Sequence, residues 1–122
     1  MLHPKGLFSM ENRTILVVED NALNMKLVRS LFKMSKYDII EAVDAETGIQ
    51  LARECKPDLI LMDIQLPGMD GLNASRIIKE DPSLKNVKIV ALTSHAMEGD
   101  EKKGREAGVM GIVQSRSIAR TL

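Results

Sequence analysis

The chain has 122 residues, of which 44% are hydrophobic, and its 17 basic residues balance 17 acidic ones. This length suits one domain with its own hydrophobic core, and the composition argues against a disordered chain. A net charge of zero gives no electrostatic reason to expect nucleic acid or a membrane surface as a partner. No hydrophobic run reaches the roughly 18 residues that a membrane-spanning helix requires.

The single cysteine, Cys55, cannot form a disulfide within the chain, which favours a reducing, cytoplasmic location. It lies on the hydrophobic stripe of a predicted helix, where we expect it to be unreactive core. Residues 1–10 lack the organisation of a signal peptide and are expected to form a flexible extension. The domain itself is then expected to cover residues 11–122.

Hydrophobic runs alternate with segments of helical periodicity. Strands are predicted over residues 14–18, 38–42, 58–62, 87–92 and 111–114, and helices over residues 21–35, 45–56, 73–80 and 98–107. The hydrophobic stripe of the first helix comprises Leu23, Leu27, Val28, Leu31 and Met34. The strands are continuously hydrophobic, which is typical of a parallel sheet covered by helices on both faces. We therefore expect an open five-stranded α/β sheet of the flavodoxin-like order 2-1-3-4-5.

Acidic residues follow the first and third predicted strands. Glu19 and Asp20 end the run "ILVVED", and Asp63 follows "LILM". In the expected strand order these strands are neighbours, so three carboxylates would meet at the carboxyl edge of the sheet. Three like charges repel unless a cation lies among them, and oxygen ligands with room for water suit Mg²⁺. A single acid at a strand end would be read as a helix cap, but three together favour a metal site.

The end of the fourth strand supplies Thr93, whose hydroxyl is placed to donate to an anionic oxygen. A lone threonine there is more often a cap for the end of the strand. The predicted site has carboxylates and a hydroxyl, but no pair of a nucleophile and a histidine that would indicate covalent hydrolysis.

Three segments together resemble the receiver domain of response regulators, the CheY-like family. They read "ILVVEDNALNMKL", "PDLILMDIQLPGMDG" and "VKIVALTSHAM". The acidic pair, Asp63, Pro67 four residues later, Gly71 eight residues later and Thr93 form a specific set. The resemblance runs from about Arg13 to Gly111. The sequences of these segments most resemble single-domain receivers of the DivK type and receivers of hybrid histidine kinases.

The resemblance implies a role for each matching residue. Asp63 would accept a phosphoryl group from the phosphohistidine of a histidine kinase or a histidine phosphotransfer protein. Asp20 would bind Mg²⁺ directly, Glu19 mostly through water, and Gln65 through its backbone carbonyl. Thr93 would bond the phosphoryl oxygen and transmit the change to a downstream protein target. Such a chain is a phosphoacceptor rather than an enzyme.

The end of the chain departs from the family pattern. The family has a lysine after the fifth strand, usually followed by proline, and here these positions hold Ser115 and Arg116. The family then closes with a further helix, whereas six residues, Ser117–Leu122, follow here. We expect that helix to be truncated or absent, which would expose a hydrophobic strip of the sheet and favour a homodimer.

Three other function classes compete with the phosphoacceptor. The missing lysine favours a module that binds a partner independently of phosphorylation, whereas the intact acids oppose it. An aspartyl-phosphate phosphatase on a related fold usually has a second acid two residues after the nucleophile, where this chain has Gln65. A flavodoxin would need small phosphate-binding residues after the first strand, where this chain has acids.

Overall fold

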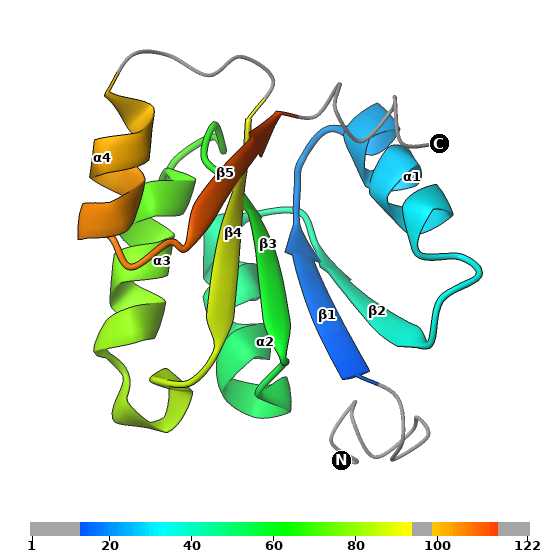
Figure 1. Cartoon of the computed structure of the whole chain (residues 1–122), viewed down its shortest axis with the longest axis horizontal. Helices are drawn as coiled ribbons and strands as arrows, with labels where there is room; N and C mark the ends of the chain where they lie inside the picture. The colour runs from blue at the N-terminus through cyan, green and yellow to red at the C-terminus, as the bar shows by residue number, and fades with distance from the viewer. Residues whose placement is uncertain (1–12, 94–98, 115–122) are drawn as a thin grey trace.

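The computed structural model of the chain describes residues 13–93 and 99–114 (Figure 1). The strands are β1 (Arg13–Val18), β2 (Tyr37–Ala42), β3 (Leu59–Asp63), β4 (Lys88–Thr93) and β5 (Gly111–Gln114). They pair in parallel in the order β2-β1-β3-β4-β5. The helices are α1 (Ala22–Leu31), α2 (Ala45–Cys55), α3 (Gly71–Glu80) and α4 (Asp100–Glu106), with a short 3₁₀ helix η2 (Pro82–Leu84). The predicted open parallel sheet is confirmed.

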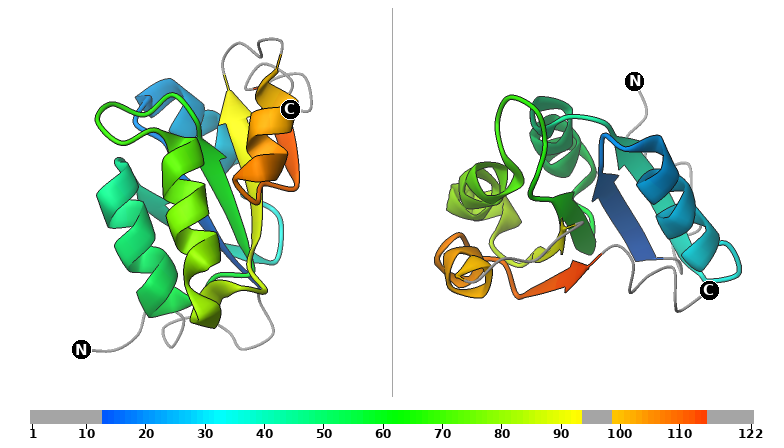
Figure 2. Two further views of the ribbon diagram at one scale, coloured as in Figure 1. Left: turned by 90° about the vertical axis from the view of Figure 1, so that its left-hand side faces the viewer. Right: turned by 90° about the horizontal axis from the view of Figure 1, so that it is seen from above.

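Helices cover both faces of the sheet (Figure 2). Side chains of β1 alternate between the faces: Leu16 and Val18 join the core under α2 and α3, while Ile15 and Val17 join the core under α1. Buried hydrophobic side chains on the α2 and α3 side include Ala42, Ile49, Ile60, Met62, Ile78 and Ile89. Because both faces of the central strands are buried, hydrophobic residues follow one another without alternation, as in Ile15–Val18 of β1.

Three helices begin with a capping side chain at the carboxyl edge of the sheet. Asn21, Asp44 and Asp70 each accept a hydrogen bond from the backbone N–H three residues later, at 3.0, 2.7 and 2.8 Å. This satisfies an otherwise unpaired N–H in the first turn of α1, α2 and α3. The acid after β2, Asp44, is therefore a cap, whereas Glu19 and Asp20 after β1 are not.

The first helix is shorter than predicted, and its buried face is different. It begins at Ala22 because Asn21 is the cap, and it ends at Leu31. Leu23 and Met34, predicted on the hydrophobic stripe, are 65% and 93% exposed, whereas Met25 is buried with Val28. Met34 lies beyond the helix. Leu23 is two residues from Met25, which turns it about 200° around the helix axis.

Other boundaries shift by one to two residues. Helix α3 begins at Gly71 rather than at Asn73, because Asp70 supplies the cap. Helix α2 ends at Cys55, since Lys56 adopts a left-handed conformation with a φ of 46°. Cys55 is buried, as predicted. Among the described residues, no helix is long and hydrophobic enough to cross a membrane.

Predictions for the end of the chain fall outside the described residues. Ser115, Arg116 and the segment 117–122 belong to this part, and so does the expected extension at residues 1–10. The loss of the family lysine's charge at Ser115 and the absence of the final helix therefore stay predictions. Of the described side chains of β5, Ile112 and Val113 are both partly buried.

Candidate functional site

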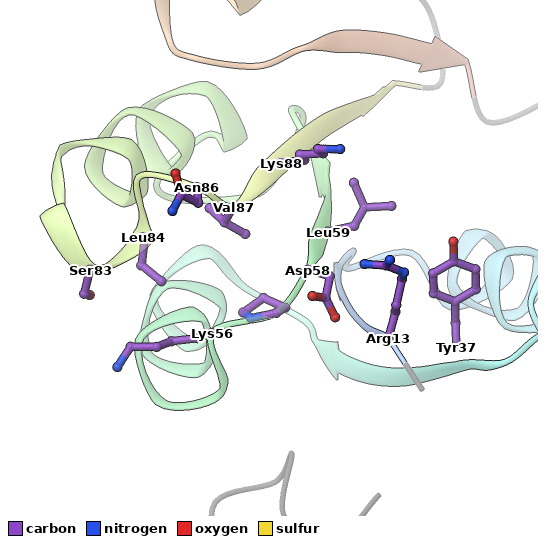
Figure 3. A pocket seen from close by; sticks show the side chains of 11 residues that line it. Arg13, Tyr37, Lys56, Asp58, Leu59, Ser83, Leu84, Asn86, Val87 and Lys88 are labelled. Atoms are coloured by element: carbon purple, nitrogen blue, oxygen red, sulfur yellow. The ribbon is translucent and has the colours of Figure 1, made fainter. Parts of the chain in front are cut away.

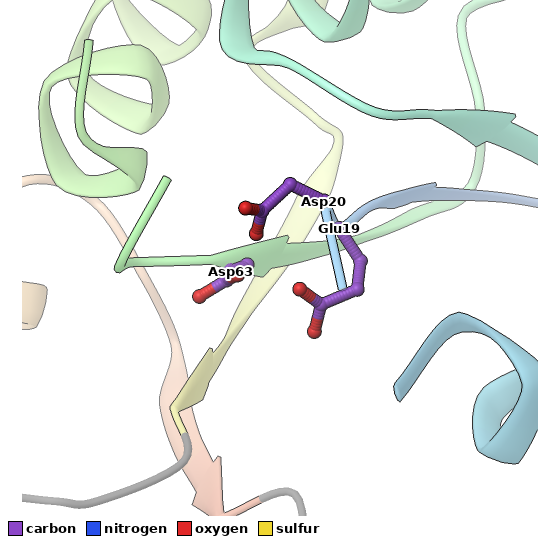
Figure 4. A group of neighbouring side chains, drawn as sticks. All are labelled: Glu19, Asp20 and Asp63. Atoms are coloured by element: carbon purple, nitrogen blue, oxygen red, sulfur yellow. The ribbon is translucent and has the colours of Figure 1, made fainter. Parts of the chain in front are cut away.

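The three acids predicted to meet do meet at the carboxyl edge of the sheet (Figure 4). One oxygen from each of Glu19, Asp20 and Asp63 lies within 4.8 Å of the others. Glu19 is 1% exposed and Asp63 is 6% exposed, whereas Asp20 is exposed to solvent. The strand order explains the cluster, because β1 and β3 are adjacent and both end at this edge. The arrangement brings two buried carboxyl groups and one solvated carboxylate together.

The backbone around Asp63 is held by its neighbours. One carboxylate oxygen of Asp63 accepts a hydrogen bond from the backbone N–H of Gln65 at 2.8 Å. At the start of α3, Gly71 packs so closely that a Cβ atom there would overlap the carbonyl oxygen of Asp63. Only glycine fits this contact, which fixes the turn after β3. The side chain of Gln65 is exposed, and its residue borders the acids.

Glu19 has the most perturbed environment among these acids. Burial, followed by hydrogen bonding and charge repulsion with Asp63, raises the pKa of Glu19 to about 8. The backbone N–H of Asn21, 3.2 Å from a Glu19 oxygen, and the side chain of Asn24 act in the opposite direction. Without a cation, a second negative charge beside Asp63 is therefore disfavoured at neutral pH. A divalent cation would relieve that repulsion.

The acids open into a hollow of about 490 Å³. Asn21, Ala22, Asn24 and Gln65 complete its lining. The donor atoms offered here are mostly carboxylate oxygens, with no described sulfur or imidazole ligand among them. Such a set suits a hard cation such as Mg²⁺ and disfavours softer metals.

Thr93 is the last residue of β4 and is buried, with 1% exposure. Strand β4 pairs with β3 so that Leu92 lies opposite Asp63. Thr93 therefore stands one residue beyond the position opposite Asp63 on the neighbouring strand, although it does not line the hollow.

Three residues of the hollow were not predicted from the sequence: Asn21, Ala22 and Asn24. The signal available in the sequence was their place at the start of the helix that follows the acidic pair.

A second hollow, of about 520 Å³, lies at the opposite, amino edge of the sheet (Figure 3). Its charged lining residues are Arg13, Lys56, Lys88 and Asp58. Asp58 accepts a hydrogen bond from the backbone N–H of Thr14 at 2.7 Å, which ties β3 to the start of β1. This carboxylate is engaged in holding the sheet together, so we place the functional site at the acidic edge.

Known proteins of one family are similar to this chain. The family model of the response regulator receiver domain matches residues 15–120. Polar-differentiation response regulator DivK from Brucella anthropi is 45% identical over 96 residues, which cover 79% of this chain and 78% of the relative. The receiver domain of sensor histidine kinase PA1611 from Pseudomonas aeruginosa, solved with a magnesium ion in its active site cleft, is 29% identical. Its TM-score is 0.77, with 90% of this chain and 93% of that chain covered.

The Mn²⁺-bound form of response regulator Rcp1 is 26% identical, with a TM-score of 0.78 over 87% of this chain and 88% of that chain. The matched family model spans most of the chain, including all three acids and Thr93. The chain belongs to the response regulator receiver family of two-component signal transduction.

Proposed function

We propose that this receiver accepts a phosphoryl group on Asp63 in a reaction that depends on Mg²⁺. The observation that carries the proposal is the convergence of Glu19, Asp20 and Asp63, whose oxygens lie within 4.8 Å of one another. The phosphoryl donor would be the phosphohistidine of a histidine kinase or of a histidine phosphotransfer protein.

The residues present fit a magnesium ion. Asp20 and Asp63 would bind it directly, Glu19 mostly through water, and Gln65 through its backbone carbonyl. The raised pKa of Glu19 supports this assignment, because burial first, and then its hydrogen bonding and charge repulsion with Asp63, make its negative charge unfavourable without a cation. When bound, Mg²⁺ neutralises the charge shared by the acceptor carboxylate and the phosphoryl oxygens. The magnesium in the active site cleft of the PA1611 receiver supports the same choice of metal.

The transfer forms one bond and breaks one. An oxygen of the Asp63 carboxylate attacks phosphorus, the P–N bond of the phosphohistidine breaks, and its electron pair stays on the imidazole nitrogen. The product is an aspartyl phosphate. The N–H of Gln65 holds one Asp63 oxygen at 2.8 Å, so the other oxygen is the better placed nucleophile. Phosphoryl transfer depends chiefly on such positioning and on charge neutralisation.

Thr93 would couple the modification to the rest of the domain. We propose that its hydroxyl donates a hydrogen bond to a phosphoryl oxygen and thereby shifts the end of β4 toward Asp63. The new charge would then bias the surface that a downstream protein target binds.

We also propose that copies of the chain associate with one another.

The test is incubation with acetyl phosphate and Mg²⁺, followed by intact-mass measurement. We expect one phosphoryl group on the wild-type chain, none with Asp63→Asn, and none when EDTA replaces Mg²⁺. The matched control is Asp44→Asn, which changes another aspartate at the carboxyl edge of the sheet. Asn caps a helix as well as Asp does, so this variant should be modified like the wild type.

An unmodified wild-type chain, under conditions that modify a known receiver, would contradict the proposal. A partner that binds the wild-type chain and Asp63→Asn with equal affinity would then favour the module that acts independently of phosphorylation.

A further inference from the structure

The hollow at the amino edge of the sheet carries an excess of positive charge. Arg13, Lys56 and Lys88 line it, together with a single acid, Asp58. Asp58 accepts the backbone N–H of Thr14 at 2.7 Å, and its own N–H donates to the carbonyl oxygen of Thr14 at 2.9 Å. The acid is thus bound into the sheet, and the lining keeps two more cations than acids.

The arginine of this hollow differs from the other described arginines. Arg29, Arg53 and Arg105 each pair with an acid, at 2.7, 3.3 and 3.5 Å, and Arg76 donates to an asparagine at 3.1 Å. Arg13 has no such partner among the described residues. Its guanidinium donors are therefore available to a ligand.

The strand register places both a cation and its neighbour on one face of the sheet. Arg13 lies opposite Tyr37 in the β1–β2 pair, and Lys88 lies opposite Leu59 in the β3–β4 pair. Ile15, two residues after Arg13, lies opposite Leu59. Because side chains alternate along a strand, all of these residues project to the face that α1 partly covers (Figure 3).

The spacing of the two cations suits an anion with more than one charge. Strands β1 and β4 flank β3, and adjacent strands lie about 4.8 Å apart, so Arg13 and Lys88 start about 10 Å apart. Both side chains are exposed, and Leu59 lies between them. The hollow of about 520 Å³ falls within the range of about 300–1,000 Å³ typical of small-molecule sites.

The lining also offers hydrophobic surface beside the cations. Tyr37 and Leu59 belong to it, and the ring of Tyr37 is held by an edge contact with Phe32, with 5.5 Å between the ring centroids. A ring in the ligand could stack on an aromatic side chain that is fixed in this way.

Positive side chains at helix ends often serve the helix, because they offset its dipole. Lys56 fits this explanation, since it follows the carboxyl end of α2. Its φ of 46° is one that glycine adopts more easily, so the helix end gives no preference for lysine. Arg13 and Lys88 are the first residues of strands, where no helix dipole accounts for them.

We propose that the amino-edge hollow binds a small anion with two or more phosphate groups and a ring, the chemical class of nucleoside diphosphates. Arg13 and Lys88 would hold the phosphate oxygens, to which a guanidinium group can donate two parallel hydrogen bonds. Lys56 would add positive charge at the rim, and Tyr37 would contact the ring. This site needs neither Mg²⁺ nor Asp63, so it stands or fails separately from the proposed function.

The experiment titrates the isotope-labelled chain with pyrophosphate and, separately, with ADP, and follows the backbone amides by nuclear magnetic resonance. EDTA is present so that metal ions cannot mediate binding at the acidic edge. We expect saturable shifts at Arg13, Leu59 and Lys88, none at Glu19 or Asp63, and tighter binding of ADP because its ring contacts Tyr37.

Charge-removing variants test the cations one at a time. Arg13→Gln and Lys88→Gln should each weaken ADP binding by about three-fold to ten-fold, the range for a charged contact that solvent still reaches. The matched control is Lys102→Gln, which removes an exposed lysine of α4 that does not line the hollow. This control should bind ADP like the wild type.

Lys56→Gly separates a role in binding from a role in the helix. Glycine suits the left-handed conformation, so this variant should keep or raise the melting temperature while it weakens ADP binding. Three results would overturn the inference: no saturable shifts below about 10 mM of either probe, shifts confined to the acidic edge, or wild-type affinity in both Arg13→Gln and Lys88→Gln.

Discussion

At the scale of single residues, the carboxyl group of Glu19 is buried beside a second acid, Asp63. Its burial beside Asp63 raises its pKa to about 8, far above that of a solvated glutamate. Ionising such a buried group costs the folded chain stability. In the proposed magnesium site, the cation would offset both the burial and the repulsion from Asp63.

The raised pKa of Glu19 makes stability depend on pH in the absence of metal. Between the unfolded value near 4.5 and the folded value near 8, the folded chain binds more protons than the unfolded chain. The free energy of unfolding should therefore fall as the pH rises from 5 to 8, and one pKa unit corresponds to about 1.4 kcal/mol. Glu19→Gln should remove this part of the slope. Thermal unfolding in EDTA measures it.

Magnesium provides the control for this prediction. By binding only the folded chain, it should raise the melting temperature of the wild type more at pH 8 than at pH 5, where Glu19 is largely protonated. Equal pH slopes for the wild type and Glu19→Gln would show that Glu19 has an ordinary pKa.

At the scale of elements, the junction between β3 and α3 holds Asp63 in place. Gly71 begins α3 directly against the backbone of Asp63, and Asp70 caps the same helix. The helix can approach this closely because Gly71 has no side chain. The turn between them contains Gly68, whose φ of 78° favours glycine.

We expect Gly71→Ala to destabilise the fold by about 1–3 kcal/mol and to displace the Asp63 backbone, because the new methyl group would overlap its carbonyl oxygen. Chemical denaturation and the rate of modification by acetyl phosphate measure the two effects. The matched control is Gly111→Ala in β5, where no atom lies within 4 Å of the added carbon. Its effect should stay within about 0.5 kcal/mol, and an equally mild Gly71→Ala would refute the contact.

At the scale of the whole molecule, the strand order places the acidic site, and the two faces of the sheet are covered by different numbers of described helices. The crossovers from β1 and β3 run in opposite directions, so the acids meet at the point where the order reverses. Helices α2 and α3 cover one face, whereas α1 is the described helix on the other (Figure 2). On that second face, Leu59, Val90 and Val113 are only partly buried.

Partly exposed hydrophobic side chains on one face favour self-association. We expect the mass measured by light scattering to rise from that of a monomer toward that of a dimer with increasing concentration. Val90→Lys should shift this transition to higher concentration, because a charge on that face opposes its burial. Leu23→Lys, a change at an exposed leucine of α1, is the matched control. A monomer at every concentration would contradict the prediction.

Much of the site could be predicted from the sequence because its signals are local. A hydrophobic run that ends in acids, as in Val18–Asp20 and Met62–Asp63, shows where a buried strand leaves the core. The alternation of strand and helix then places those ends at one edge of a parallel sheet. Helix bounds were predicted less well. Asn21 and Asp70 are helix caps, but residues of these types also occur inside helices and in turns, so the sequence alone does not mark where each helix begins.

By itself, the sequence determined the order of strands and helices, the family and the three acids, because each depends on the pattern of neighbouring residues. Only the tertiary structure decided that Leu23 is exposed, that Glu19 is buried beside Asp63, and that Asn24 lines the same hollow as these acids. These properties arise from contacts between β1, α1 and β3. The free energy of a buried charge depends on all the groups around it, and no local pattern encodes that sum.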